Sequence, residues 1–175
     1  MPLVLLAAVI EQEQSLMSDS IKKEANLLKL LFNLVDKPNN QQRSMLLNGC
    51  IQYIKLVGPT TVNNFLLSEC WEQINDKNEE RRILVAESCS TLAPYINADM
   101  RSSLMFSILK QIIELEKSDL VREHAVKSLS ILINYIKDEQ KFVQVISYFI
   151  CLIFEKFRLL NLKIKVYRFI THVCN

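Results

Sequence analysis

Glycine and proline are scarce in this chain, and their scarcity restricts the folds that it can adopt. The 175 residues include 2 glycines and 4 prolines, where average usage gives roughly 12 and 9. Tight hairpin turns and glycine-rich phosphate loops both depend on glycine. The sequence therefore argues against Rossmann, P-loop, collagen-like and most all-β folds, and it favours helices joined by short loops.

The few prolines punctuate a helical pattern. Pro38, Pro59 and Pro94 each stand where a run of helically spaced apolar residues ends, and Gly58 joins one of these stops. No stretch shows sustained strand-like alternation. Apolar spacing and capping residues predict helices at about 25–35, 45–57, 60–75, 80–92, 98–115, 118–136, 139–154 and 162–173.

The predicted helices form a repeat. Arg43, Arg82 and Arg122 occupy equivalent places at spacings of 39 and 40 residues, and a weaker fourth copy places Lys163 there. Each arginine is followed by a small residue and then an apolar one. These pairs are Gly49-Cys50, Ser88-Cys89 and Ser128-Leu129. One helix pair cannot bury its apolar faces alone, whereas stacked pairs share a continuous core. We therefore expect residues 1–175 to form one all-α domain, an α-solenoid of about four antiparallel helix pairs.

The third copy resembles a HEAT repeat. Residues 119–129 read DLVREHAVKSL and match the pattern D-x-V-R-x-x-A-x-x-x-L that opens the second helix of such repeats. This resemblance implies a HEAT/armadillo-like fold in which Asp and Arg near the turn pair along the stack. Only Asp119 and Asp76 are in place to supply the acid, so we expect an incomplete ladder.

A longer series of short motifs resembles one particular family. In order along the chain, the motifs are Gly58-Pro59-Thr60, residues 70–75 (CWEQIN), 84–89 (LVAESC), 92–95 (LAPY), 101–104 (RSSL) and Tyr135-Ile136. They are similar to the HEAT region of the RELCH family, whose members combine LisH, coiled-coil and HEAT-repeat segments. The similarity covers about 24–142, and residues 146–175 depart from the family pattern.

The family resemblance implies a non-catalytic scaffold. Its members are cytosolic adaptors that link recycling endosomes and the trans-Golgi network, bind a Rab-family small GTPase and oxysterol-binding protein, and support intracellular cholesterol transport. The LisH and coiled-coil parts lie outside this sequence. On this interpretation the chain is cytoplasmic, associates with membranes peripherally through its partners, and needs no cofactor.

Residue chemistry agrees with a protein that is not an enzyme. The two histidines are His124, which we expect on a helix surface, and His172, which lies two residues from Cys174 and so on another helix face. The five cysteines are odd in number and form no CxxC motif, which favours reduced thiols in a reducing compartment. No catalytic, cofactor-binding or metal-binding residue is predicted.

Two apolar stretches do not satisfy the requirements of a targeting or membrane segment. Residues 2–10 lack the positive flank of a signal peptide, and acidic residues follow them directly. The uncharged stretch 142–154 is shorter than the roughly 20 residues that a membrane span requires. We expect its aromatic residues to form core between repeats, with an exposed face as the alternative.

Candidate contact residues for a protein partner are Arg81, Arg82, Arg101 and Trp71. The three arginines are expected in exposed, rigidly held turns between helices, and arginine is enriched at interfaces. Trp71 is expected as a buried wedge between repeats, and the alternative is a binding hot spot.

Two other functions stay open at this stage. One is a HEAT-type scaffold unrelated to sterol. The other is a binder of acidic membranes or nucleic acid through residues 151–175, where basic residues outnumber acidic ones by five to one. The net charge of the whole chain is only +2, with a pI of about 8.2, below the usual range of nucleic-acid-binding domains.

Overall fold

All regular elements in the described part of the chain are helices. The computed structural model describes residues 29–30, 32–58 and 69–158. The predicted helix at 162–173, the basic tail, residues 2–10 and most of the helices at 25–35 and 60–75 lie outside these residues. The elements are α3 (Asn40–Val57), α5 (Glu79–Thr91), η1 (Ala93–Tyr95), α6 (Ala98–Met100), η2 (Arg101–Met105), α7 (Phe106–Leu115), α8 (Asp119–Leu132), η3 (Ile133–Tyr135) and α9 (Glu139–Arg158).

Helix α3 begins five residues earlier than its predicted start at Met45. The Asn39 side chain accepts a hydrogen bond from the Gln42 N–H, and the Gln42 side chain accepts one from the Asn39 N–H, both at 2.9 Å. This capping box satisfies N–H groups that would otherwise lack partners at the helix start. The predicted stop is confirmed, because Gly58 has a φ of 86° and its N–H donates to the carbonyl oxygen of Ile54.

Helices α5 and α8 end in the same way. Each is followed by a short 3-10 helix that closes on a tyrosine, Tyr95 in η1 and Tyr135 in η3. The next residues, Ile96 and Ile136, are both buried, and each donates its N–H back into the 3-10 helix. The 40-residue correspondence seen in the sequence is therefore a correspondence of backbone conformation.

The helix predicted at 98–115 is interrupted by the π-helical element η2, which joins α6 to α7. Two predicted caps are present in this half of the chain. The Ser118 side chain accepts from the Val121 N–H at the start of α8, and the Asp138 side chain accepts from the Lys141 N–H at the start of α9. Side-chain oxygens at these positions stabilise a helix start by about 1 kcal/mol.

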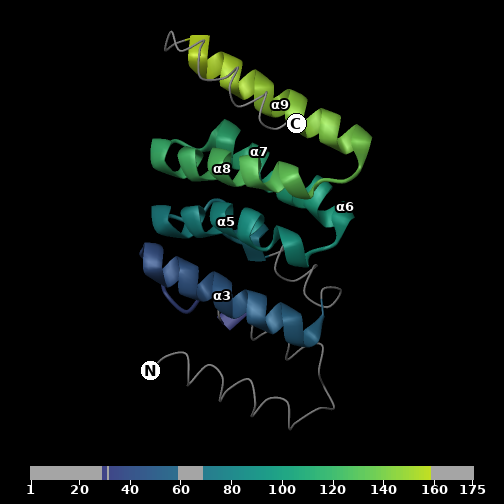
Figure 1. Cartoon of the computed structure of the whole chain (residues 1–175). Coiled ribbons are helices and arrows are strands. Elements are labelled where there is room, and N and C mark those ends of the chain that lie inside the picture. Colours follow the sequence, from purple (N-terminus) through teal and green to yellow (C-terminus); the bar gives the residue numbers. More distant parts are fainter. Residues whose placement is uncertain (1–28, 31, 59–68, 159–175) are drawn as a thin grey trace.

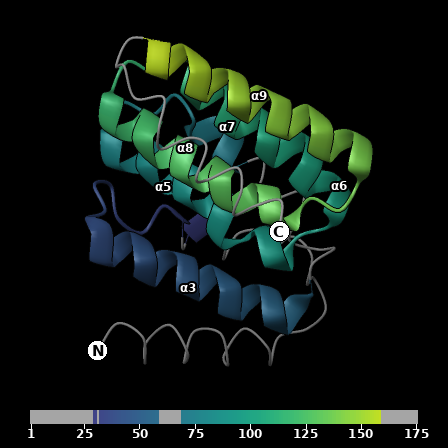
Figure 2. The same ribbon diagram turned by 45° about the horizontal axis from the view of Figure 1, so that its top comes forward.

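The helices are arranged in successive levels. Helices α3, α5 and α8 lie side by side in that order, with α7 behind α8 and α9 beyond them (Figure 1 and Figure 2). Helix α8 packs extensively against both α5 and α7. A single hydrophobic cluster runs through these levels, and its largest fully buried side chains are Phe32, Leu84, Leu92, Met105, Ile108, Leu109, Leu129 and Leu132.

The aromatic side chains described on α9 belong to this core. Phe149 is buried, while Phe142 and Tyr148 pack against the core cluster. The Tyr148 ring meets Phe106 edge to face, with centroids 5.6 Å apart. This confirms the interpretation of these residues as core between helix levels. Among the described residues, none of the helices combines the length and apolar character needed to span a bilayer.

Candidate protein-interaction site

The three repeated arginines make the same contact with the backbone. Each guanidinium donates from Nη1 to a carbonyl oxygen in the turn that precedes its own helix, at 2.6 to 3.0 Å. The pairs are Arg43 with Pro38, Arg82 with Asp76 and Arg122 with Glu116. An arginine in the first turn of the helix thus fixes the preceding turn, which explains why the residue recurs every 39 or 40 positions.

The acidic partners of these arginines differ from those that the HEAT resemblance implies. Arg43 pairs with Glu87 at 2.9 Å, and Arg82 pairs with Glu116. Only Arg122 pairs with the predicted Asp119, within its own helix. The described residues therefore show no full Asp–Arg ladder along the stack, in line with the expected shortage of aspartates, and glutamates from α5 and from the turn before α8 supply the acid between levels.

Arg81 is buried, which contradicts its expected exposure in a turn. Its side chain is 6% exposed, because it points between α5 and the preceding segments. Nη1 donates to the carbonyl oxygen of Phe32 at 3.0 Å and to Gln73 Oε1 at 3.1 Å, and Nη2 donates to Asn33 Oδ1 at 2.9 Å. Arg81 therefore fastens three segments together.

Arg82 and Arg101 are also more enclosed than expected. Arg82 is largely covered by its contacts with Glu116 and the Asp76 carbonyl group. Arg101 donates from Nη1 to the carbonyl oxygen of Ala93 at 3.2 Å, and its Nε is buried without a hydrogen-bond partner. Both side chains are partly buried and make internal contacts, so neither is the freely exposed contact that the sequence suggested.

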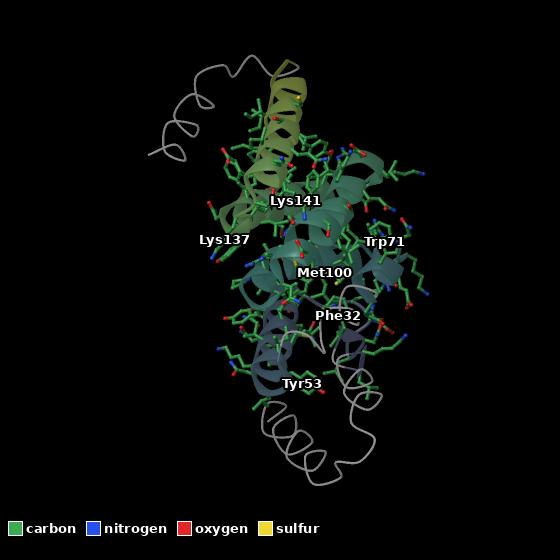
Figure 3. The ribbon with its side chains drawn as sticks, turned by 90° about the vertical axis from the view of Figure 1, so that its right-hand side faces the viewer. Phe32, Tyr53, Trp71, Met100, Lys137 and Lys141 are labelled. Atoms are coloured by element: carbon green, nitrogen blue, oxygen red, sulfur yellow. The ribbon has the colours of Figure 1, made fainter. Side chains whose placement is uncertain are left out.

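Trp71 is exposed, which contradicts its interpretation as a buried wedge. It is 44% exposed and lies at one edge of the molecule, with Lys137 at the other edge in the view of Figure 3. A large exposed aromatic side chain fits the alternative interpretation, a contact residue for a partner. Of the four candidates, it is the one whose side chain offers a large exposed apolar surface.

A hollow is lined by residues at the ends of two helical segments, and one of these segments contains Trp71. Ile74 and Asn75, about one turn after Trp71, line it together with Leu115 and Lys117 near the end of α7. Leu115 is 70% exposed and was not singled out from the sequence, because its helical register fits a core stripe. Trp71 itself does not line the hollow, and Ile74 is buried. We call Trp71 together with Ile74, Asn75, Leu115 and Lys117 the turn-edge surface.

Arg82 and Glu116, which form an ion pair, also line this hollow. Burial raises the pKa of the Glu116 carboxyl, but hydrogen bonds from Arg82 and from the N–H groups of Ser118 and Lys117 outweigh burial and hold the pKa below its usual range. The carboxylate therefore stays ionised and keeps the turn closed on Arg82.

Several of the remaining reactive side chains are engaged in packing or pairing, whereas Cys151 of α9 is free and exposed. His124 is half-buried, with Nδ1 3.0 Å from Glu87 Oε1. Cys50, Cys70 and Cys89 are free and buried, and burial raises the pKa of Cys50 and of Cys70 to about 12. Thiols in such surroundings are unreactive. Within the ranges that the structure describes, no group of three His, Cys, Asp or Glu side chains is placed to hold a metal ion.

Fold and site together define a protein whose described part is helical, in which Arg43 and Arg82 pair with glutamates of the next helix level and Trp71 and Leu115 stay exposed. A family model described as the RAB11-binding protein RELCH N-terminal domain matches residues 2–160. The chain belongs to this RELCH family. The match extends beyond residue 142, where the resemblance noted in the sequence ends.

Individual relatives agree with the family match. The chain is 48% identical over 143 residues to the RAB11-binding protein RELCH of Mus musculus and to that of Homo sapiens. It is 46% identical over the same length to the RELCH homolog of Xenopus tropicalis. Each alignment covers 82% of this chain and 11% of the relative, so the chain spans about a tenth of the length of the curated relatives it matches. No solved structure matches.

Proposed function

We propose that this chain is a non-catalytic protein-interaction segment that contributes to binding a Rab-family small GTPase. The observation that carries the proposal is its 48% identity over 143 residues to relatives named as RAB11-binding proteins.

The turn-edge surface is the proposed contact. Trp71 and Leu115 supply exposed apolar area, and the neighbouring turn is held by Arg82, Glu116 and Arg122. A few large side chains on a rigid support carry most of the energy of a typical interface, because little conformational freedom is lost on binding.

The finer parts of the proposal rest on the family. We take the helix levels to be HEAT-type repeats of an α-solenoid. We place the protein on the cytoplasmic surface of recycling endosomes and the trans-Golgi network, with oxysterol-binding protein as a second partner in cholesterol transport. The wild-type chain can be tested for this second partner in the same binding format as the GTPase.

The test is a titration of the chain with Rab11 loaded either with a GTP analogue or with GDP, followed by calorimetry. We expect nucleotide-dependent binding that weakens at least tenfold in Trp71→Ala and in Leu115→Ala. The matched control is Leu56→Ala, which shortens another exposed leucine at the far end of α3.

Each outcome decides a separate part of the proposal. Absence of binding to Rab11 in both nucleotide states contradicts GTPase binding by this segment. Binding that is equally strong in Trp71→Ala, Leu115→Ala and Leu56→Ala contradicts the assignment to the turn-edge surface.

A further inference from the structure

Side chains of α3, α5 and α8 line a second hollow. These three helices lie side by side in Figure 1. Its volume is about 380 Å³, and all three helices contribute side chains to it. Asn48 belongs to the α3 wall, Thr91 comes from α5, and His124 and Lys127 come from α8. We call this hollow the inter-level groove.

The α3 wall carries hydrogen-bonding groups that the described structure does not use. Asn40, Ser44 and Asn48 follow one another at intervals of four residues, so they form one stripe on the helix. All three are exposed, and none of their side chains makes a hydrogen bond within the described part of the chain. The buried hydroxyl groups of the groove do form a hydrogen bond, since Ser90 Oγ donates to Ser128 Oγ at 3.2 Å.

Asparagine is suited to bind a peptide backbone. Its side-chain amide has both a donor and an acceptor, which match the carbonyl and N–H groups of an extended chain. The three helix axes of the groove, at the usual spacing of 8–10 Å, span roughly 20 Å. An extended peptide rises about 3.3 Å per residue, so about six residues cross the groove.

The charged side chains of the inter-level groove indicate whether an acidic or a basic peptide fits it. The acid in the groove, Glu87, is engaged by Arg43 at 2.9 Å and by His124 at 3.0 Å, so its charge is compensated within the protein. Lys127 stands exposed on the α8 rim, and its ion pair within the described ranges is with Glu123 of its own helix. An exposed pair of this type contributes about 0–1 kcal/mol and readily exchanges partners. Lys127 can therefore leave Glu123 and offer its positive charge to a bound chain.

We propose that the inter-level groove binds an extended, acidic peptide segment of a partner protein. The stripe of Asn40, Ser44 and Asn48 pairs with the peptide backbone, and Lys127 pairs with an Asp or Glu side chain of the peptide. This inference rests on the proposed protein-interaction role, but it uses a different surface and does not depend on the GTPase.

The experiment begins with selection of a phage-displayed library of random seven-residue peptides on the immobilised full-length chain. We expect sequences rich in Asp and Glu. Fluorescence anisotropy of one enriched synthetic peptide then gives its dissociation constant, which we expect to rise at least tenfold in Asn48→Ala and in Lys127→Glu.

Matched controls separate binding from folding. Gln144→Ala removes an exposed amide from α9, outside the groove. Lys110→Glu reverses a lysine of α7 that, like Lys127, pairs with a glutamate four residues away, here Glu114. Lys110 also lies 5.3 Å from the centre of the Tyr148 ring, so this control loses at least as many internal contacts as Lys127→Glu. Both controls are expected to bind the peptide as the wild type does.

Three results would overturn the proposal: selection without acidic enrichment, equal effects of Lys127→Glu and Lys110→Glu, or self-association of the chain that Asn48→Ala abolishes. The last result would assign the groove to a second copy. Rab11 binding measured on the same variants keeps the two proposals apart, because Asn48→Ala is expected to leave it unchanged.

Discussion

Arg82 and Arg122 occupy equivalent places in consecutive helix levels, but their surroundings differ. Arg82 reaches forward to Glu116, a largely buried carboxylate in the next turn, while Arg122 pairs with Asp119, which is 90% exposed. Both also bind the backbone carbonyl of the preceding turn. From this comparison we expect each repeated arginine to stabilise the fold more strongly when its acidic partner is buried by the next helix level.

The largest effect is expected at the neighbouring buried residue. Arg81→Ala should lower the free energy of unfolding by about 3 kcal/mol, because it leaves the Phe32 carbonyl and Gln73 Oε1 without a buried donor. It also removes one of the two donors to Asn33 Oδ1, the other being Gln73 Nε2. Urea unfolding followed by circular dichroism measures this loss. The exposed Lys77→Ala is the control and should stay within about 0.5 kcal/mol of the wild type. Equal losses in the two variants would contradict the buried role of Arg81.

Arg82→Ala is expected to cost about 2 kcal/mol in the same measurement, since a partly covered ion pair and a backbone contact are lost together. Arg82→Lys should recover part of the loss, because a lysine keeps the charge but cannot contact Glu116 and the Asp76 carbonyl with a planar fork. Full recovery by lysine would show that geometry is unimportant at this junction.

The junction should also make stability depend on pH. The pKa of Glu116 is lower in the folded protein than its value of about 4.3 in an unfolded chain. Its contribution is therefore complete above that unfolded value and is lost as the pH falls through the folded pKa. Unfolding curves between pH 3 and 7 should show a smaller acid-induced loss in Glu116→Gln. Parallel pH profiles for the two proteins would contradict the coupling to Arg82.

The smallest effect on the free energy of unfolding is expected at Arg122, whose acidic partner is exposed. Arg122→Ala should lower the free energy of unfolding by no more than about 1 kcal/mol. The ion pair with the exposed Asp119 contributes little, so the main loss is the hydrogen bond to the Glu116 carbonyl. Double-mutant cycles with Asp119→Ala and with Glu116→Gln measure the two pairs separately. A larger coupling energy for Arg122 with Asp119 than for Arg82 with Glu116 would reverse the comparison.

Local signals explain what the sequence could predict. Proline and glycine mark helix ends through their own backbone restrictions, so the stops at Gly58 and near Pro94 are correct. The arginine repeat is visible because its main partner, a carbonyl group, lies only five or six residues earlier. The first turn of α3 is polar and carries no helical apolar spacing, so the local signal for its start is the Asn39–Gln42 capping box.

Long-range contacts explain what the sequence could not predict. The burial of Arg81 depends on Gln73, Asn33 and Phe32, which are 8, 48 and 49 residues away. An arginine next to another arginine and two glutamates has the composition of a solvated helix start. Similarly, the inter-level groove combines residues from three helices separated by about 40 positions each, and its hollow arises only from their packing.

The π-helical element η2 lies in the longer of the two intervals between the repeated arginines. Arg82 and Arg122 are 40 residues apart, whereas Arg43 and Arg82 are 39 apart, and η2 lies in the longer interval. A π turn closes its hydrogen bond over one more residue than an α turn. An inserted residue can therefore be absorbed locally as a bulge, while the helical faces on either side keep their orientation. A stack built in this way tolerates repeats of unequal length and still brings each arginine back to its own turn.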